Sequence, residues 1–279
     1  MRSLLSLFLI IGFVISPLMA QTTGPENGHL VIVGGAMKSE AIVQEFIDLA
    51  GGLNAPIVVI PTAAGRDTYS DNAGLAGRLK KMGASKVTVL HTNNRDEANS
   101  EKFTAPLVGA SGVWFGGGRQ WRLVDAYANT LTEKLVQKVL ERGGVVGGSS
   151  AGATIQGSYL VRGDTKSNQI MMGDHEQGFG YIKNVAIDQH VLARNRQFDL
   201  YEIMRKHPEL LGLGIDENTA IVVSGDSFRV IGESYVLVYD GSFWSREGHE
   251  QKKLPDKEHL FYMLRSGDQY NMLQRKVID

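Results

Sequence analysis

A serine lies at the centre of a glycine-rich pentapeptide, Gly148-Ser149-Ser150-Ala151-Gly152, which fits the pattern G-x-S-x-G. In that pattern the serine occupies a strained turn between a buried strand and a helix, and its hydroxyl projects from the sheet as a nucleophile. The N–H of Ala151 faces the same space and can stabilise an oxyanion. Ser149 is the competing candidate, but its frame lacks the second glycine. No lysine follows in the Walker arrangement of a phosphate-binding loop, so we take Ser150 as the candidate nucleophile.

A serine nucleophile needs a base within hydrogen-bond reach, and the sequence contains seven histidines. His190 is the best placed, because it lies at the carboxyl end of the predicted strand 185–190 and would share the edge of the sheet with the serine. His175, in a short acidic segment, is the runner-up, and His91 also follows a predicted strand. One histidine between two carboxylates on a predicted loop is weak evidence for a metal ion, and we infer none. Structural or solvent-exposed roles are assigned to the remaining four, His29, His207, His249 and His259.

Ser150 and His190 have to be positioned by a sheet. The first half of the chain predicts one, because short apolar runs alternate there with amphipathic segments. The runs 29–33, 55–60, 86–90, 111–115 and 145–146 predict strands, and 39–49, 70–82, 119–127 and 131–142 predict helices. Such alternation is typical of an α/β fold with a mostly parallel sheet and helices on both faces. In these folds, sites form at the carboxyl ends of the strands.

The second half of the chain has a different pattern of predicted secondary structure. Segment 160–181 is rich in glycine and polar residues and is predicted to be irregular and to line the cleft. A helix is expected over 198–207, ending before Pro208. Short apolar runs separated by Gly-Asp and Asp-Gly turns then predict C-terminal β-hairpins.

Composition narrows the class of protein. The 279 residues carry a formal net charge of −1, which gives no reason to expect nucleic acid as a partner. There is no cysteine, so disulfides and a thiolate nucleophile are excluded. We find no linker or internal repeat, and predict one α/β domain over 21–279.

Residues 1–20 are predicted to be a secretory signal peptide. Arg2 precedes an apolar run from Leu4 to Val14, and Ala20 offers a small residue for cleavage before Gln21. The run is shorter than the ~20 residues of a spanning helix. We therefore expect an exported protein, periplasmic or extracellular, with no stable membrane association after cleavage.

Three motifs in a fixed order resemble one family. They are Gly148 to Ala153, then Ile187-Asp188-Gln189-His190 followed by Arg194 and Arg196, and then Gly212-Leu213-Gly214-Ile215-Asp216-Glu217-Asn218-Thr219-Ala220. Together, over residues 30–240, they resemble the cyanophycinase branch of the serine peptidases, which also include aspartyl dipeptidase. The resemblance implies a flavodoxin-like fold related to class I glutamine amidotransferases, often dimeric. It further implies Ser150 as nucleophile, His190 as general base, aspartyl or β-aspartyl peptide substrates, and no metal or organic cofactor.

The same resemblance assigns further site residues. The run Gly116-Gly117-Gly118-Arg119-Gln120 is similar to the family's Gly-Gly-x-Gln loop, which makes Gly118 the second oxyanion donor beside Ala151 and makes Gln120 a substrate contact. A guanidinium can clamp a substrate carboxylate with two bonds, and Asp188 could bind a cationic side chain. The residues that the resemblance places along the pocket are Asp188, Gln189, Arg194 and Arg196.

The chain departs from the family pattern at two positions. The family carries an acidic third catalytic residue shortly after a Gly-Asp pair, where this chain has Lys166 or Ser167. We take Asp164 as the third catalytic residue, with Glu176 as the alternative. Cyanophycinases also carry a further arginine where this chain has Asp199, a change that would weaken binding of a poly-aspartate backbone.

The function predicted from the sequence is an exported serine peptidase acting on aspartyl-type peptide bonds. Two alternatives stay open. One is a catalytically weak peptide-binding homologue, which Lys166 favours. The other is an amidase on the same scaffold, although such enzymes usually employ a cysteine.

Overall fold

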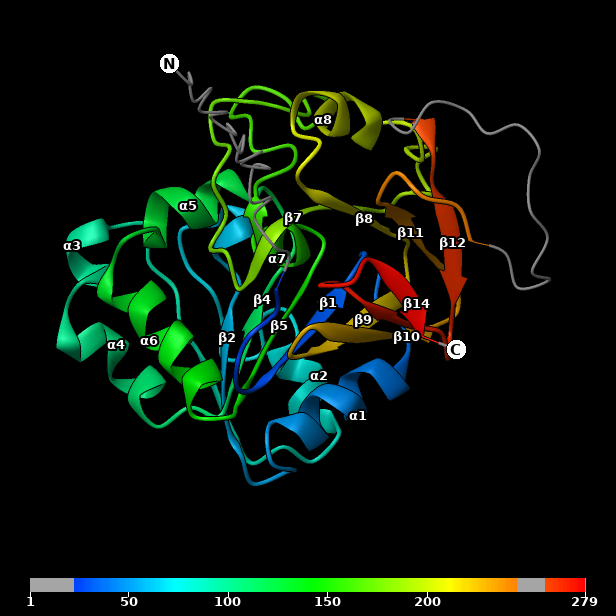
Figure 1. The fold of residues 1–279 in the computed structure, drawn as a ribbon. Coiled ribbons are helices and arrows are strands. Elements are labelled where there is room, and N and C mark those ends of the chain that lie inside the picture. Colours follow the sequence, from blue (N-terminus) through cyan, green and yellow to red (C-terminus); the bar gives the residue numbers. More distant parts are fainter. Residues whose placement is uncertain (1–22, 245–258, 279) are drawn as a thin grey trace, which may run out of the picture.

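The structure is a computed structural model and describes residues 23–244 and 259–278 (Figure 1). The predicted signal peptide, residues 1–20, lies outside the described residues. None of the helices in the described parts of the chain is long and apolar enough to cross a membrane.

A nine-stranded sheet forms the centre of the molecule, with the strand order β14-β13-β10-β9-β1-β5-β4-β2-β3. Its five N-terminal strands run parallel, and the C-terminal strands are added antiparallel beyond β1. The strands are β1 (His29–Val33), β2 (Pro56–Ile60), β3 (Lys86–Val89), β4 (Gly112–Phe115), β5 (Val145–Ser149), β9 (Thr219–Ser224), β10 (Ser227–Gly232), β13 (Gln269–Asn271) and β14 (Lys276–Ile278).

A second sheet of five strands has the order β12-β11-β8-β7-β6. Strands β6, β7 and β8 are parallel, and β11 and β12 are antiparallel to their neighbours. The members are β6 (Gly157–Tyr159), β7 (Ile182–Gln189), β8 (Leu211–Ile215), β11 (Tyr235–Tyr239) and β12 (Tyr262–Arg265). The α/β class and the mostly parallel central sheet are therefore confirmed, but the strands are divided between two sheets.

The helices cover both faces of the central sheet, because alternate side chains of its strands are buried on opposite sides. On one face Val31 and Val33 pack with α1 (Glu40–Leu49) and α2 (Ala76–Lys81). On the other face Leu30 and Ile32 share one core with a helical group and with the five-stranded sheet. That group contains α3 (Arg95–Ala98), α4 (Glu101–Val108), α5 (Trp121–Tyr127) and α6 (Leu131–Glu141).

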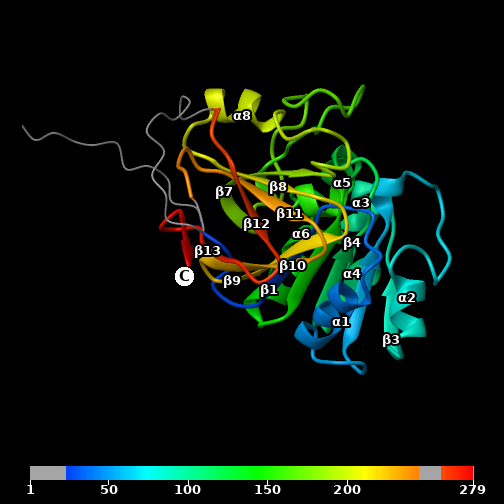
Figure 2. The same cartoon turned by 90° about the vertical axis from the view of Figure 1, so that its right-hand side faces the viewer.

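The outer face of the second sheet is covered by α8 (Leu200–Lys206), which Figures 1 and 2 both show above β8. Ile203 and Met204 of this helix pack with Ala186 and Leu237 of the sheet. The same small core contains Val161, in the segment that follows β6. This packing fixes the segments on both sides of β7, which carry several of the predicted pocket residues.

The structure differs from the sequence analysis at three points. The helix expected over 70–82 begins only at Ala76, because Gly74 has a left-handed φ of 58° that interrupts a helix. The run 211–215 is strand β8, which we had not predicted. The expected hairpins are confirmed for β9 and β10, but β11 leaves that pattern and pairs with β8 and β12 in the second sheet.

Candidate active site

The turn after β5 holds Ser150 in a strained conformation, with φ 58° and ψ −114°, directly before the short helix α7 (Ala151–Thr154). The flanking glycines are required for close packing. A Cβ on Gly148 would lie 2.2 Å from the carbonyl oxygen of Gly152, and one on Gly152 would lie 2.1 Å from that of Phe115. The backbone strain is therefore imposed by surroundings that leave no room for a larger residue, as at a nucleophile elbow.

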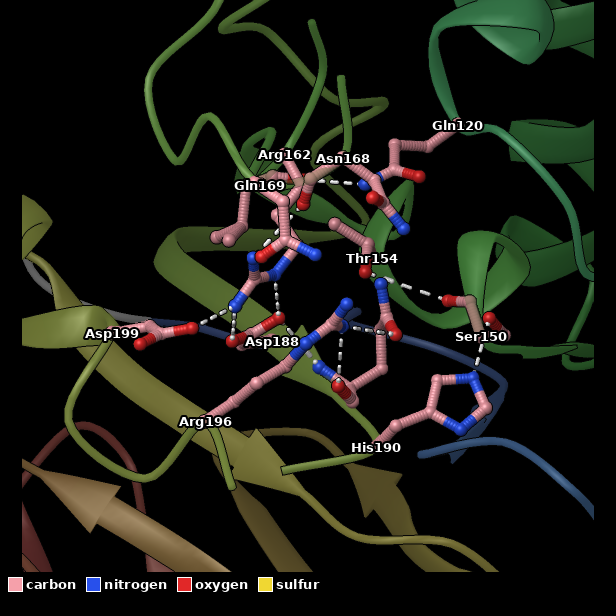
Figure 3. Close-up of polar contacts among 12 residues, drawn as sticks. Gln120, Ser150, Thr154, Arg162, Asn168, Gln169, Asp188, His190, Arg196 and Asp199 are labelled. Carbon is pink, nitrogen blue, oxygen red and sulfur yellow. Dashed lines mark hydrogen bonds and ion pairs between the residues drawn. The ribbon is translucent and has the colours of Figure 1, made fainter. Parts of the chain in front are cut away.

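The hydroxyl of Ser150 meets the imidazole of His190, with 2.9 Å between Oγ and Nε2 (Figure 3). We expected the two residues to share one sheet edge, and this is wrong. Ser150 follows β5 of the nine-stranded sheet, whereas His190 follows β7 of the five-stranded sheet. Strand β7 pairs with β6 and β8, and the ends of the two sheets converge at this point.

The loop after β1 connects the two sides of this junction. The N–H of Ser150 donates to the carbonyl of Val33 at 3.0 Å, and the N–H of His190 donates to that of Gly34 at 2.8 Å. The next residue, Gly35, has φ 126°, and a Cβ there would lie 2.1 Å from Cε1 of the His190 ring. Only a glycine leaves space for the imidazole, so this loop sets the position of the ring.

The acidic partner of His190 is Glu217, whose Oε1 lies 2.6 Å from Nδ1. A carboxylate there accepts a hydrogen bond from Nδ1–H, which leaves the lone pair of Nε2 to accept the proton of the serine hydroxyl. Asp164 does not contact His190: its Oδ1 accepts the N–H groups of Lys166 and Ser167 at 2.8 and 2.9 Å.

The expectation for Asp164 fails because the carboxylate is occupied in its own turn. Glu176, the alternative, accepts a hydrogen bond from Tyr159. Lys166 belongs to the turn around Asp164 and does not stand in the place of an acid. We assigned no role to Glu217, although it lies two residues after the apolar run 211–215 within a motif that we had singled out. A carboxylate just past a buried strand is the signal that could have identified it.

The electrostatic surroundings keep His190 neutral. Burial lowers the pKa of His190 below its ordinary value, the hydrogen bond with Glu217 acts in the opposite direction, and the charge of Arg194 lowers it further. A neutral imidazole near pH 7 is the form that can accept a proton.

Backbone donors for an oxyanion are available beside Ser150. The N–H groups of Gly117, Gly118 and Ala151 make no backbone hydrogen bond to any other group in the described ranges. Of the two glycines, Gly117 is the one against the serine, since a Cβ there would lie 3.4 Å from Cβ of Ser150. Gly118 has φ 144° and packs against the carbonyl of Ala63, so it shapes the turn that presents this loop.

Of the other predicted pocket residues, Figure 3 shows Gln120, Asp188 and Arg196 in the same region as Ser150 and His190. Gln120 is buried, and its amide donates to the carbonyl of Val161 at 2.6 Å. Arg196 is 5 % exposed, and its Nη1 donates to the main-chain and side-chain oxygens of Gln189. Among residues 23–244 and 259–278, Arg196 forms no ion pair with a carboxylate. Arg194 is exposed.

Asp188 differs from its expected role. It is fully buried, and both of its oxygens accept hydrogen bonds from the guanidinium of Arg162, at 2.8 and 2.9 Å. An arginine of the chain itself therefore occupies the carboxylate that we had considered for a cationic substrate side chain. We had not predicted any role for Arg162, which lies in the glycine-rich segment after β6.

The two other candidate histidines have different partners. His175 lies between Asp174 and Asp125, with contacts of 3.0 and 2.9 Å. His91 contacts the hydroxyl of Thr62 at 2.8 Å. In the described part of the chain, no group of three or more His, Asp or Glu side chains is arranged to hold a metal ion.

Comparison with known proteins matches this chain to one class of enzyme, the serine-type peptidases. Peptidase family S51 matches residues 30–231. The cyanophycinase of Geminocystis herdmanii is 32% identical over 256 residues, which cover 88% of this chain and 94% of that protein. That of Trichormus variabilis is 31% identical, with 89% and 87% covered. The crystal structure of a peptidase from an acI-B1 Actinobacterium is similar with a TM-score of 0.63 and 25% identity, covering 89% of this chain and 98% of that one.

The chain therefore belongs to peptidase family S51 and is a serine-type peptidase.

Proposed function

We propose that this protein is an exported peptidase that hydrolyses aspartyl or β-aspartyl peptide bonds, with Ser150 as nucleophile and His190 as general base. The observation that carries the proposal is the hydrogen-bonded series Ser150–His190–Glu217, in which each contact is 2.9 Å or shorter. An imidazole held by a carboxylate on one side and facing a serine hydroxyl on the other is the arrangement that activates a serine.

The reaction follows from this geometry. Nε2 of His190 accepts the hydroxyl proton while Oγ of Ser150 attacks the peptide carbonyl, and Glu217 stabilises the imidazolium that forms. The N–H groups of Ala151 and of the Gly117–Gly118 loop would hold the oxyanion, because they have no other backbone partner in the described ranges and Gly117 packs against Ser150. His190 then donates its proton to the leaving amine, and water hydrolyses the acyl-enzyme.

The aspartyl preference is supported by Arg196. A buried guanidinium without a carboxylate partner is energetically costly, and a substrate carboxylate that pairs with it would remove this cost. Two relatives that are about one third identical are named cyanophycinase, which also supports an aspartyl substrate for this chain. Gln120 and Gln189, both buried, would contact the substrate backbone.

A fluorophosphonate probe tests the core of the proposal. We expect labelling of the wild-type protein at Ser150 and none in Ser150→Ala, whereas Ser149→Ala, its neighbour in the same turn, should be labelled. The same three proteins are then assayed with cyanophycin, β-Asp-Arg, isoaspartyl dipeptides and α-aspartyl dipeptides. Turnover by Ser150→Ala, or labelling at Ser149, would refute the assignment.

Export is part of the proposal and depends on the pattern of residues 1–20. The N-terminal sequence of the mature protein should begin near Gln21, and the protein should be recovered from the periplasm or the medium. A protein that keeps Met1 and stays in the cytoplasm would contradict export without affecting the proposed reaction. The homodimer implied by the family resemblance is checked by light scattering.

A further inference from the structure

A buried guanidinium is shared by two carboxylates next to the proposed substrate pocket (Figure 3). Arg162 has no exposed surface, and its Nε and Nη2 donate to the two oxygens of Asp188. The same Nη2 donates to Oδ2 of Asp199 at 2.5 Å, and Nη1 donates to the carbonyl of Asn168 at 2.9 Å. All three guanidinium nitrogens are therefore used within the protein.

The two carboxylates differ in what they can still bind. Asp188 is fully buried, both of its oxygens are paired with Arg162, and its Oδ1 also accepts the N–H of Gln189 at 2.9 Å, so a bound molecule cannot reach it. The side chain of Asp199 is 36% exposed, and within the described residues Arg162 is its one hydrogen-bond partner. Asp199 can consequently accept a further hydrogen bond from a bound molecule, whereas Asp188 cannot.

The charges of this group do not cancel. One guanidinium between two carboxylates leaves a surplus negative charge, which lies at Asp199 because Asp188 is paired with Arg162 through both oxygens. Arg196, buried and without an ion pair in the described ranges, supplies a separate positive charge. In the view of Figure 3, Arg196 is on the side of Ser150 and His190, and Asp199 is at the far end of the group. Going away from the serine, this group thus presents first a cation, Arg196, and then an anion, Asp199.

We propose that Asp199 is a specificity-determining residue: it favours substrates that carry a cationic group on the residue linked to the aspartyl residue, and it disfavours a second carboxylate there. The proposal rests on the proposed function, since it assumes that Arg196 binds the aspartyl carboxylate. Opposite charges in a partly desolvated site attract, and like charges repel, so one residue produces both effects. Because Asp199 is partly exposed, the effect is moderate.

Three dipeptides of similar size test this inference: β-Asp-Lys, β-Asp-Gln and β-Asp-Glu. The wild-type protein should rank them in that order by kcat/KM. In Asp199→Asn, which keeps the shape of the side chain and an oxygen for Arg162, the ratio of kcat/KM for β-Asp-Lys to that for β-Asp-Glu should fall by about fivefold. Asp226→Asn, in the β9–β10 turn at the opposite end of the sheet, removes the same charge and should leave the ratio unchanged.

The ratio is measured within one protein preparation, so partial unfolding of a variant does not alter it. A ratio in Asp199→Asn within twofold of the wild-type value would overturn the inference, as would an equal change in Asp226→Asn. If the wild-type protein cleaves none of the dipeptides, the proposed function fails. In that case the dissociation constants of the same dipeptides are measured for Ser150→Ala and for Ser150→Ala/Asp199→Asn. If neither protein binds the dipeptides, or if the ratio of the dissociation constants of β-Asp-Lys and β-Asp-Glu is the same in both proteins, the inference is overturned.

Discussion

Oε1 of Glu217 lies 2.6 Å from Nδ1 of His190. Glu217 is in the turn between β8, which belongs to the five-stranded sheet, and β9, which belongs to the nine-stranded sheet. The chain therefore passes from one sheet to the other at the residue that holds the imidazole. Asn218, the next residue, donates its N–H to the carbonyl of Gly35 and accepts the N–H groups of Lys38 and Ser39. This turn is thus fixed to the same loop that contacts the His190 ring.

Replacement of Glu217 by glutamine should reduce kcat on aspartyl dipeptides by about 10²-fold or more, because the neutral amide no longer stabilises the imidazolium or its tautomer. The rate of fluorophosphonate labelling should fall in parallel. The matched change Asp164→Asn alters a turn and should cost about 1 kcal/mol of stability with labelling close to the wild-type rate. Equal losses of labelling in both variants would contradict the assignment of Glu217.

Replacement of Gly35 by alanine should displace the imidazole, since the added Cβ would lie 2.1 Å from Cε1 of His190 and φ is 126°. We expect a loss of about 1–3 kcal/mol in the free energy of unfolding and a larger loss of kcat/KM than instability alone explains. Gly109→Ala is the control, because a Cβ there meets nothing within 4 Å. Full activity of a folded Gly35→Ala protein would show that the ring does not depend on this contact.

The pH dependence of kcat/KM should report His190. Burial lowers the pKa of His190, so the acid limb of the profile should lie below the ordinary histidine value, with activity gained as the pH rises and the imidazole loses its proton. Arg194→Gln removes a positive charge that lowers this pKa, and the limb should therefore move to higher pH. Lys102→Gln, on α4, removes one positive charge elsewhere and should not move it. An acid limb that moves to lower pH in Arg194→Gln would contradict the predicted effect of Arg194 on the pKa of His190.

Arg196 should affect substrate binding but not the reactivity of the serine. Arg196→Gln should lower kcat/KM for aspartyl peptides by about 10²-fold, the cost of losing a buried ion pair with the substrate. Labelling by a fluorophosphonate without a carboxylate should be nearly unchanged. Arg196→Lys keeps the charge but cannot form the bidentate hydrogen bonds of a guanidinium, so its kcat/KM should be intermediate between those of the wild-type protein and Arg196→Gln. Parallel losses of labelling and of peptide hydrolysis would assign Arg196 a structural role.

Local sequence was sufficient to predict the strained turn at Ser150 and most of the central sheet. Gly148 is required by a backbone contact with Gly152 inside the turn, and, apart from the late start of α2, the apolar runs and helical stripes of residues 29–149 form elements close to the predicted bounds. Such features depend on neighbours along the chain, and composition and spacing therefore report them directly.

The partners of these residues were decided by tertiary structure. Nothing near His190 in the sequence distinguishes Glu217 from Asp164, because the choice depends on which turn reaches the junction of the two sheets. The division of the strands between those sheets has the same origin: pairing of β11 with β8 rather than with β10 is a long-range event that no local pattern encodes. The occupation of Asp188 by Arg162 likewise appears only when segments 26 residues apart meet in a buried site, where each charge must find a partner.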